Sequence, residues 1–145
     1  MATDQANSEY VHVVVTQDNV LERFDFIFAP WIKQMGLTDW QVEPGRVRAR
    51  LPQSTDLQFF SGAICGQAIM AVIDTVMSMA MGTSEQFSRG TSYQHTHFLR
   101  PAAGQDLLID ARVVRFGRSS HYGECWVTYA ESGREVAHAT LEFAG

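Results

Sequence analysis

The sequence predicts an α+β domain in which an antiparallel β-sheet wraps around one long central helix. Residues 62–82 are apolar on nearly every side, as expected of a helix buried in a core. The segments before and after it alternate apolar and polar residues, which is the pattern of half-buried strands. Glycine and proline separate these segments by short turns, which favours antiparallel neighbours.

Length, charge and cysteine content restrict the class of protein. The 145 residues suit a single domain over residues 1–145, of which we expect 1–15 to be a partly flexible N-terminal segment. A net charge of -5 provides no basic surface for nucleic acid, so we expect no nucleic-acid partner. The two cysteines form no disulfide or zinc pattern, and no secretory signal is recognisable, which favours the cytoplasm.

The N-terminal part predicts a helix over residues 19–36, where apolar side chains recur at helical spacing. Asn19 and Glu22 resemble a capping box at its start, and Pro30 is expected to kink or split the helix. Residues 10–15 are rich in β-prone side chains and predict a short strand.

Residues 46–51 alternate strictly between basic and apolar side chains, which predicts a strand with one buried face. A turn at Pro44 and Gly45 lets residues 40–42 pair with this strand as a hairpin. The basic side chains form a strip that is either an ordinary solvated sheet face or a phosphate-binding surface. This basic strip consists of Arg46, Arg48 and Arg50.

The apolar segment 62–82 carries one acidic residue, Asp74, near its middle. A carboxylate inside a buried helix is costly unless it is paired or takes part in chemistry. We therefore expect Asp74 either to transfer protons or to be a structural residue that caps or pairs. Gln67 and Ser78 also interrupt the segment, and no basic residues flank it closely, so we expect no membrane association.

Four further strands are predicted after the central helix, at residues 91–99, 107–116, 123–130 and 135–143. Strict alternation along the first of them places His95 and His97 on the same face as Thr91 and Tyr93. Two histidines at this spacing can bind zinc, but no third ligand is apparent. We therefore expect no metal, and assign the pair to a pocket wall or a dimer interface.

Three short motifs stand in order along residues 40–143. Gly62, Gly66 and Asp74 have the spacing of a Gly-x-x-His-Gly-Gly motif that is followed, after six residues, by Asp. Phe-Leu-Arg-Pro-Ala ends a strand at residues 98–102, and Gly117 with Arg118 forms a turn after the next strand. With this order of elements, the chain resembles the hotdog fold, and more narrowly the PaaI-like acyl-CoA thioesterases of the thioesterase superfamily.

The resemblance implies a catalytic role for Asp74, which activates water or attacks the thioester carbonyl to form a mixed anhydride. It implies that the Gly66 N–H, at the start of the central helix, polarises this carbonyl and stabilises the oxyanion. Thr91 stands where the family often carries a serine or threonine that orients the water or the carboxylate. In the family, the glycine and aspartate of one site come from different subunits, which implies a homodimer or a dimer of dimers with the site at the subunit interface.

The same resemblance implies a set of substrate-binding residues around the motif. Gly62 keeps its motif position, while Cys65, Gln67 and Phe59 stand where the family has a histidine, its second glycine and often an asparagine. Cys65 is either a nucleophile or a small buried apolar residue. Gln67 either donates a hydrogen bond to the substrate or to Asp74, or is an ordinary residue at the helix start.

The same resemblance implies that Arg118, Ser119 and Ser120 contact the phosphates or pantetheine of coenzyme A. An ordinary polar turn is the alternative for these three residues. Arg100 is a second candidate for binding the same phosphates.

The function implied is hydrolysis of acyl-CoA or aryl-CoA thioesters to the free acid and coenzyme A, with no cofactor besides the CoA of the substrate. A non-catalytic acyl-CoA-binding or regulatory domain is the alternative, because Cys65 and Phe59 replace polar groups of the family's site. A hotdog dehydratase is less favoured, since its acid–base pair includes a histidine that neither Cys65 nor Asp74 supplies.

Overall fold

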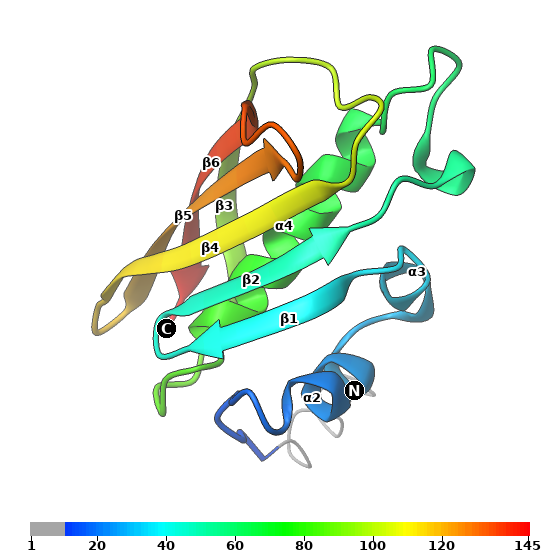
Figure 1. Ribbon diagram of the computed structural model, residues 1–145. Helices are drawn as coiled ribbons and strands as arrows, with labels where there is room; N and C mark the ends of the chain where they lie inside the picture. The colour runs from blue at the N-terminus through cyan, green and yellow to red at the C-terminus, as the bar shows by residue number, and fades with distance from the viewer. Residues whose placement is uncertain (1–10) are drawn as a thin grey trace, which may run out of the picture.

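The computed structural model describes residues 11–145 and has the predicted α+β architecture, with an antiparallel sheet wrapped around one helix (Figure 1). The strand order is β1-β2-β4-β5-β6-β3, so β1 and β3 are the edge strands. The predicted strands from residue 40 onward are all present, and β5 begins three residues earlier than expected. Their bounds are β1 (Thr38–Glu43), β2 (Arg46–Leu51), β3 (Gly90–Phe98), β4 (Leu107–Phe116), β5 (Ser120–Tyr129) and β6 (Glu135–Ala144).

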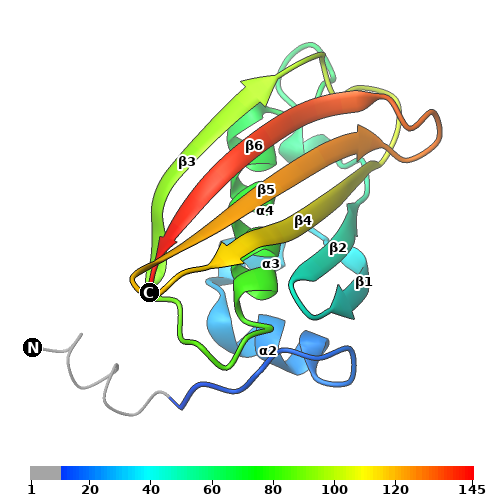
Figure 2. The same cartoon turned by 90° about the vertical axis from the view of Figure 1, so that its left-hand side faces the viewer.

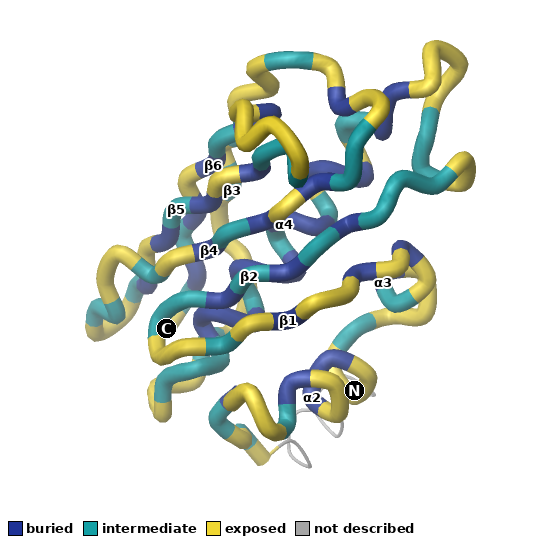
Figure 3. The backbone as a smooth tube through the Cα atoms, viewed as in Figure 1, coloured by how far each residue is buried: buried dark blue, intermediate teal, exposed yellow. Residues whose placement is uncertain are grey.

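The central helix α4 (Gly66–Met81) lies against the inner face of the curved sheet (Figure 2). Its core-facing residues are buried, and Val72, Ile73 and Val76 among them have no exposed surface. Alternate residues of β2, β4, β5 and β6 are also buried and form the core together with α4, whereas no residue of the edge strand β3 is buried (Figure 3). None of the helices within residues 11–145 is long and apolar enough to cross a membrane.

One side of α4 is not buried, which differs from the expectation of a helix enclosed on every side. Four residues at helical spacing form an accessible stripe, with two of them exposed and two half-buried. The stripe lies on the side of α4 next to the edge strand β3, whose Thr91 and Gln94 contact Asp74 and Met70. Its members are Gln67, Met70, Asp74 and Ser78.

Pro30 splits the N-terminal helix, as predicted, into α2 (Val20–Ile27) and α3 (Pro30–Lys33). The proline takes the first position of α3, where its missing N–H is not needed. The predicted capping box is wrong, because the Asn19 side chain makes no capping bond to the helix. Its Oδ1 instead accepts a hydrogen bond from the Thr16 N–H (2.8 Å), a donor in the turn that precedes α2.

The strand predicted at residues 10–15 is not formed by residues 11–15, and residues 1–10, with most of the predicted flexible segment, lie outside the described residues. Residues 12 and 15 instead contact the chain around the end of α4. The Val15 N–H donates to the Gly82 carbonyl (2.8 Å), and a His12 ring nitrogen lies 2.7 Å from the Ser84 carbonyl oxygen. The last carbonyls of a helix have no N–H partner within the helix, so they can accept hydrogen bonds from another segment. Residues 11–15 bind here and do not pair with a strand.

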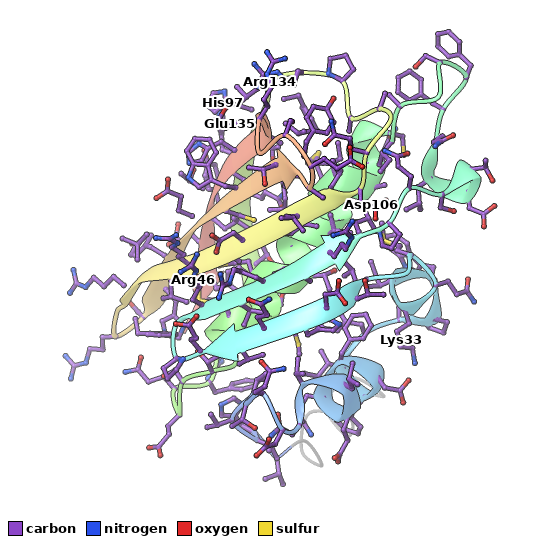
Figure 4. All side chains as sticks on the ribbon, in the orientation of Figure 1. Lys33, Arg46, His97, Asp106, Arg134 and Glu135 are labelled. Carbon is purple, nitrogen blue, oxygen red and sulfur yellow. The ribbon has the colours of Figure 1, made fainter. Side chains whose placement is uncertain are left out.

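Each arginine of the basic strip is paired with a carboxylate on the outer face of the sheet (Figure 4). Arg46 donates two hydrogen bonds to Asp110, from Nε (3.0 Å) and from Nη2 (2.8 Å). Arg48 is paired with Glu43 (3.0 Å) and Arg50 with Asp106 (2.9 Å). The pairing neutralises the strip and favours the solvated sheet face over a phosphate-binding surface.

These pairs shift the titration of both aspartates. Burial raises the pKa of Asp110, but the hydrogen bonds and charges of Arg46 and Arg112 outweigh it, so its pKa lies below the ordinary value. The pKa of Asp106 is also lowered, first by the hydrogen bond from the Gln53 N–H (2.9 Å) and then by that from Arg50. Both carboxylates therefore stabilise the folded chain when they are charged.

A bulge in β3 changes which side chains share a face. Thr91 pairs with Phe143 of β6, but the register shifts before Tyr93, which pairs with Glu142. Because strand side chains alternate with a period of two, one extra residue moves everything after it to the other face. Thr91 therefore lies on the inner face, and the prediction that it shares a face with the histidines is wrong.

The two histidines of β3 lie on the outer face, where His97 pairs across strands with His138. The Nε2 atoms of His95 and His97 are 3.1 Å apart, and His138 Nε2 lies 2.8 Å from the Glu124 carboxylate. Within residues 11–145, no group of three or more His, Cys, Asp or Glu side chains is arranged to hold a metal ion.

Candidate active site

Asp74 and Thr91 are in direct contact, which joins the middle of α4 to the beginning of β3. The Thr91 hydroxyl donates a hydrogen bond to Asp74 Oδ1. Asp74 is half-buried and lies on the accessible stripe, so its carboxylate is neither enclosed in the core nor fully in solvent. The β3 bulge makes this contact possible, since it turns Thr91 toward the helix.

The second carboxylate oxygen of Asp74 has no hydrogen-bond donor within residues 11–145. The neighbouring Ser78 does not supply one, because its hydroxyl donates to the Asp74 backbone carbonyl (2.7 Å). Among the described residues, one oxygen is thus held by Thr91 and the other has no donor. A carboxylate held in this way can accept a proton from water or attack a carbonyl carbon.

Gly66 is the first residue of α4, so its N–H has no acceptor within the helix. Cys65 precedes it in an extended conformation (φ -67°, ψ 151°), and the Cys65 side chain makes no capping bond. The helix dipole adds partial positive charge at this end. A Cβ at position 66 would lie 3.3 Å from the Phe98 ring, so packing against β3 is a reason for glycine here besides access for a ligand.

A shallow apolar groove of about 370 Å³ opens beside the start of α4. It runs between the helix and the chain that follows β3, and it includes Gly66 together with the predicted substrate-binding residues Phe59 and Arg100. We call it the proximal groove. Its other lining residues are Ala63, Ile64, Ile69, Phe98, Leu99, Pro101 and Ala102.

The loop before α4 contains η1 (Thr55–Leu57) and a tight turn that carries two predicted residues. Gly62 has a φ of 87° and donates its N–H to the Phe59 carbonyl (2.9 Å). Only glycine adopts this φ without strain, which explains why the turn needs it. The Phe59 side chain is half-exposed, and Gln67 is the second residue of α4 and exposed.

Gly66 and Asp74 are not brought together within one chain. Asp74 follows Gly66 by eight positions, which is about 12 Å along the helix axis. An N–H group and a carboxylate that act on one carbonyl must both lie within a few ångströms of it. The two groups therefore belong to different local sites of a single chain.

The two basic positions predicted to bind phosphates also lie apart. Arg100 follows the end of β3, and its Nη1 donates to the Glu135 carbonyl and lies 3.7 Å from the Glu135 carboxylate. The turn of Arg118 and Ser119 leads into Ser120, which pairs with Ala144 at the end where β3 begins. The length of β3, about 26 Å, separates these ends (Figure 1).

A larger groove, of about 900 Å³, was not predicted from the sequence. It lies where residues 12–15, the end of α2 and the start of β3 meet the C-terminal end of α4. We call it the distal groove. The sequence shows that residues 13–15 and 26–28 are largely apolar. It does not show that these segments meet, because their meeting depends on contacts between distant parts of the chain.

Ser88 and His121 form a pair at the edge of the distal groove that was also not predicted from the sequence. The Ser88 hydroxyl lies 2.6 Å from His121 Nδ1, and His121 is 1% exposed. Ser88 lines the groove, whereas the histidine lies behind it. Each group satisfies the other, as buried polar groups require.

The sequence profile of the thioesterase superfamily matches residues 62–137, which is more than half of the chain. The chain therefore belongs to the thioesterase superfamily, and its fold is the hotdog fold that was predicted. No curated protein matches it in sequence.

Solved structures of similar fold include several thioesterase-family proteins. Zebrafish thioesterase superfamily member 2 has a TM-score of 0.80 at 20% identity, covering 90% of this chain and 98% of its own. The E. coli PaaI protein of the phenylacetic acid degradation operon has a TM-score of 0.75 at 16% identity, covering 88% and 94%. The smu.793 protein of Streptococcus mutans, solved bound to acetyl CoA, has a TM-score of 0.70 at 23% identity, covering 76% and 89%. At these identities, the likeness shows the fold alone.

Proposed function

We propose that this protein hydrolyses acyl-CoA or aryl-CoA thioesters to the free acid and coenzyme A. The observation that carries the proposal is the contact between Asp74 and Thr91, which holds one carboxylate oxygen and leaves the other open at the accessible stripe of α4. Membership of the thioesterase superfamily supports the same reaction class.

Asp74 acts in this proposal as general base or as nucleophile. As a base, its open oxygen takes a proton from water while the water oxygen bonds to the thioester carbon. The C–S bond then breaks, and the proton passes to the departing CoA thiolate. As a nucleophile, the carboxylate displaces the thiolate to form a mixed anhydride, which water cleaves. Carboxylate and water suffice for both routes, so the proposal includes no cofactor.

The oxyanion donor is the Gly66 N–H of a second copy of the chain. The separation of about 12 Å between Gly66 and Asp74 supports a site shared by two copies, since one chain cannot place both groups on one carbonyl. The edge position of β3 and the accessible stripe of α4 offer a surface on which a second copy can pack. We therefore propose a homodimer, or a dimer of dimers.

The remaining predicted residues bind the substrate in this proposal. Gly62, Cys65, Gln67 and Phe59 surround the start of α4 and contact the thioester and pantetheine. The CoA phosphates bind Arg100 together with Arg118, Ser119 and Ser120 at the start of β5, which only a second copy can bring near Arg100. The acetyl CoA bound to the structurally similar Streptococcus mutans protein supports a CoA ester as the ligand class.

A non-catalytic acyl-CoA-binding domain is the second candidate function. Cys65 and Phe59 favour it, because neither side chain offers the polar group that the family's histidine and asparagine supply. This candidate keeps the same ligand and differs only in turnover.

Free-thiol release from a panel of short, long and aromatic acyl-CoAs tests the proposal directly. We expect turnover by the wild-type protein and a loss of about 100-fold or more in Asp74→Asn, since the amide can neither accept the proton nor attack. Turnover that survives in Asp74→Asn would exclude the mechanism. Tight binding of CoA esters without any turnover would establish the second candidate instead.

A further inference from the structure

The distal groove lies immediately beyond the Asp74–Thr91 pair on both elements that carry it. Ser78, which lines the groove, follows Asp74 by one helical turn, about 6 Å along α4. Gly90, which also lines it, directly precedes Thr91 at the start of β3. A molecule that reacts at Asp74 can therefore extend into this groove without crossing another element of the chain.

The groove walls are mostly apolar. Val13 and Val15 come from the N-terminal segment, Ile27 and Phe28 from the end of α2, and Phe143 from β6. Figure 2 shows α2 beside the C-terminal end of α4 and the loop that leads into β3. None of the described lining residues is acidic. Such walls suit a hydrocarbon ligand.

Three polar side chains of the groove have partners within the chain, and the fourth polar lining residue, Arg89, is exposed at its edge. The Ser88 hydroxyl is paired with His121, the Ser78 hydroxyl donates to the Asp74 carbonyl, and a His12 ring nitrogen contacts the Ser84 carbonyl. The Ser88, Ser78 and His12 side chains need no polar ligand, because each already has a hydrogen-bond partner. The volume of about 900 Å³ is at the upper end of the range for small-molecule sites.

We propose that the distal groove binds the acyl part of the thioester and selects extended apolar acyl groups over short ones. The inference rests on the proposed function, because it places the reacting carbonyl at Asp74. From there the acyl chain runs along α4 past Ser78 into the groove, while the pantetheine extends toward the start of the second copy's α4. Each methylene that enters the groove adds apolar burial, so kcat/KM rises by about fourfold per methylene until the groove is full.

Filling the groove tests the proposal. Ile27 lines it at the end of α2 and is 41% exposed, so Ile27→Trp adds bulk without disturbing the core. Leu21 lies on the same helix, is 68% exposed and is not among the lining residues, so Leu21→Trp is the matched control. The substrates are straight-chain acyl-CoAs from acetyl-CoA to palmitoyl-CoA.

We expect Ile27→Trp to lower kcat/KM for the long acyl-CoAs by about tenfold or more and to leave acetyl-CoA within about twofold of wild type. Leu21→Trp should keep the wild-type chain-length profile. Chain-length profiles that are unchanged, or lowered equally for all substrates, would overturn the proposal. If a second copy of the chain occupied the groove instead, Ile27→Trp would change the oligomeric state in solution and leave the chain-length selectivity unchanged. That result would also contradict the proposal.

Binding distinguishes a failure of this inference from a failure of the proposed function. If no thioester is turned over, the hydrolase function fails, but calorimetric titration still compares palmitoyl-CoA with acetyl-CoA. The groove then predicts tighter binding of palmitoyl-CoA, and Ile27→Trp should abolish the difference while Leu21→Trp should not. Equal affinity of the wild-type protein for both ligands would contradict the groove assignment.

Discussion

Thr91 donates a hydrogen bond to the carboxylate of Asp74, although strict alternation along the strand would place it beside the outward-facing histidines. The bulge between Thr91 and Tyr93 turns this one side chain toward α4. The contact holds one oxygen of Asp74, and the other has no donor among the described residues.

Thr91→Ala is expected to lower kcat by about 10- to 100-fold, because a hydrogen bond to a charged group is worth about 1.5–3 kcal/mol. Thr91→Ser keeps the hydroxyl and should retain most of the activity. Steady-state thioester hydrolysis by both variants, with circular dichroism to verify folding, provides the measurement. Equal losses in the alanine and serine variants would mean that the hydroxyl does not orient Asp74.

Gly66→Pro removes the N–H that we assign as the oxyanion donor. The change suits the local backbone, because proline is favoured at the first position of a helix and Cys65 already has the extended conformation that proline requires before it. We expect kcat to fall by about 100- to 1000-fold. Gly66→Ala is the control, since it keeps the N–H but places a similar Cβ against Phe98. A loss in Gly66→Ala as large as in Gly66→Pro would assign the effect to packing.

Asp106→Asn is expected to destabilise the fold at neutral pH by about 1–3 kcal/mol, since the hydrogen bonds from Gln53 and Arg50 lose their charged acceptor. The pKa of Asp106 is lowered in the folded state, so its contribution is present above its unfolded pKa of about 4 and is lost as pH falls through the folded value. Urea unfolding at neutral pH and at about pH 3 should therefore show that acid lowers the free energy of unfolding less in the variant than in the wild type. An equal decrease in both proteins would mean that the charged Asp106 does not stabilise the fold.

Ser88→Ala is expected to lower the free energy of unfolding by about 1–3 kcal/mol, because it leaves Nδ1 of the buried His121 without its partner. Ser61→Ala, at an exposed position in the loop before α4, should change it by less than about 0.5 kcal/mol. Thermal or urea unfolding of the two variants makes the comparison. A difference within error between them would mean that the Ser88–His121 contact adds nothing to stability.

Local patterns in the sequence were sufficient for most of the architecture. The apolar segment around Asp74 predicted α4, the alternation at residues 46–51 predicted β2, and Pro30 predicted the split between α2 and α3. These features depend on periodicity and backbone chemistry, which a short segment determines by itself.

The features that were not predicted depend on contacts between distant segments. The β3 bulge carries no glycine at its centre and follows from the register with β6. The carboxylates that pair with the basic strip are brought to it by the β1–β2 and β2–β4 pairings and by the chain that leads into β4. The Ser88–His121 pair joins residues 33 positions apart. The accessible stripe on α4 arises because a single chain covers only part of the helix, which composition alone does not indicate.

Subunit complementation distinguishes a site shared between two copies from a site within one chain. Asp74→Asn and Gly66→Pro chains, each inactive alone, are co-expressed with different affinity tags, and the heterodimer is purified. One of its two sites then combines an intact Asp74 with an intact Gly66 from the other chain, so we predict about half the wild-type thioesterase activity per dimer. A heterodimer as inactive as its parents would exclude a site shared between the two copies.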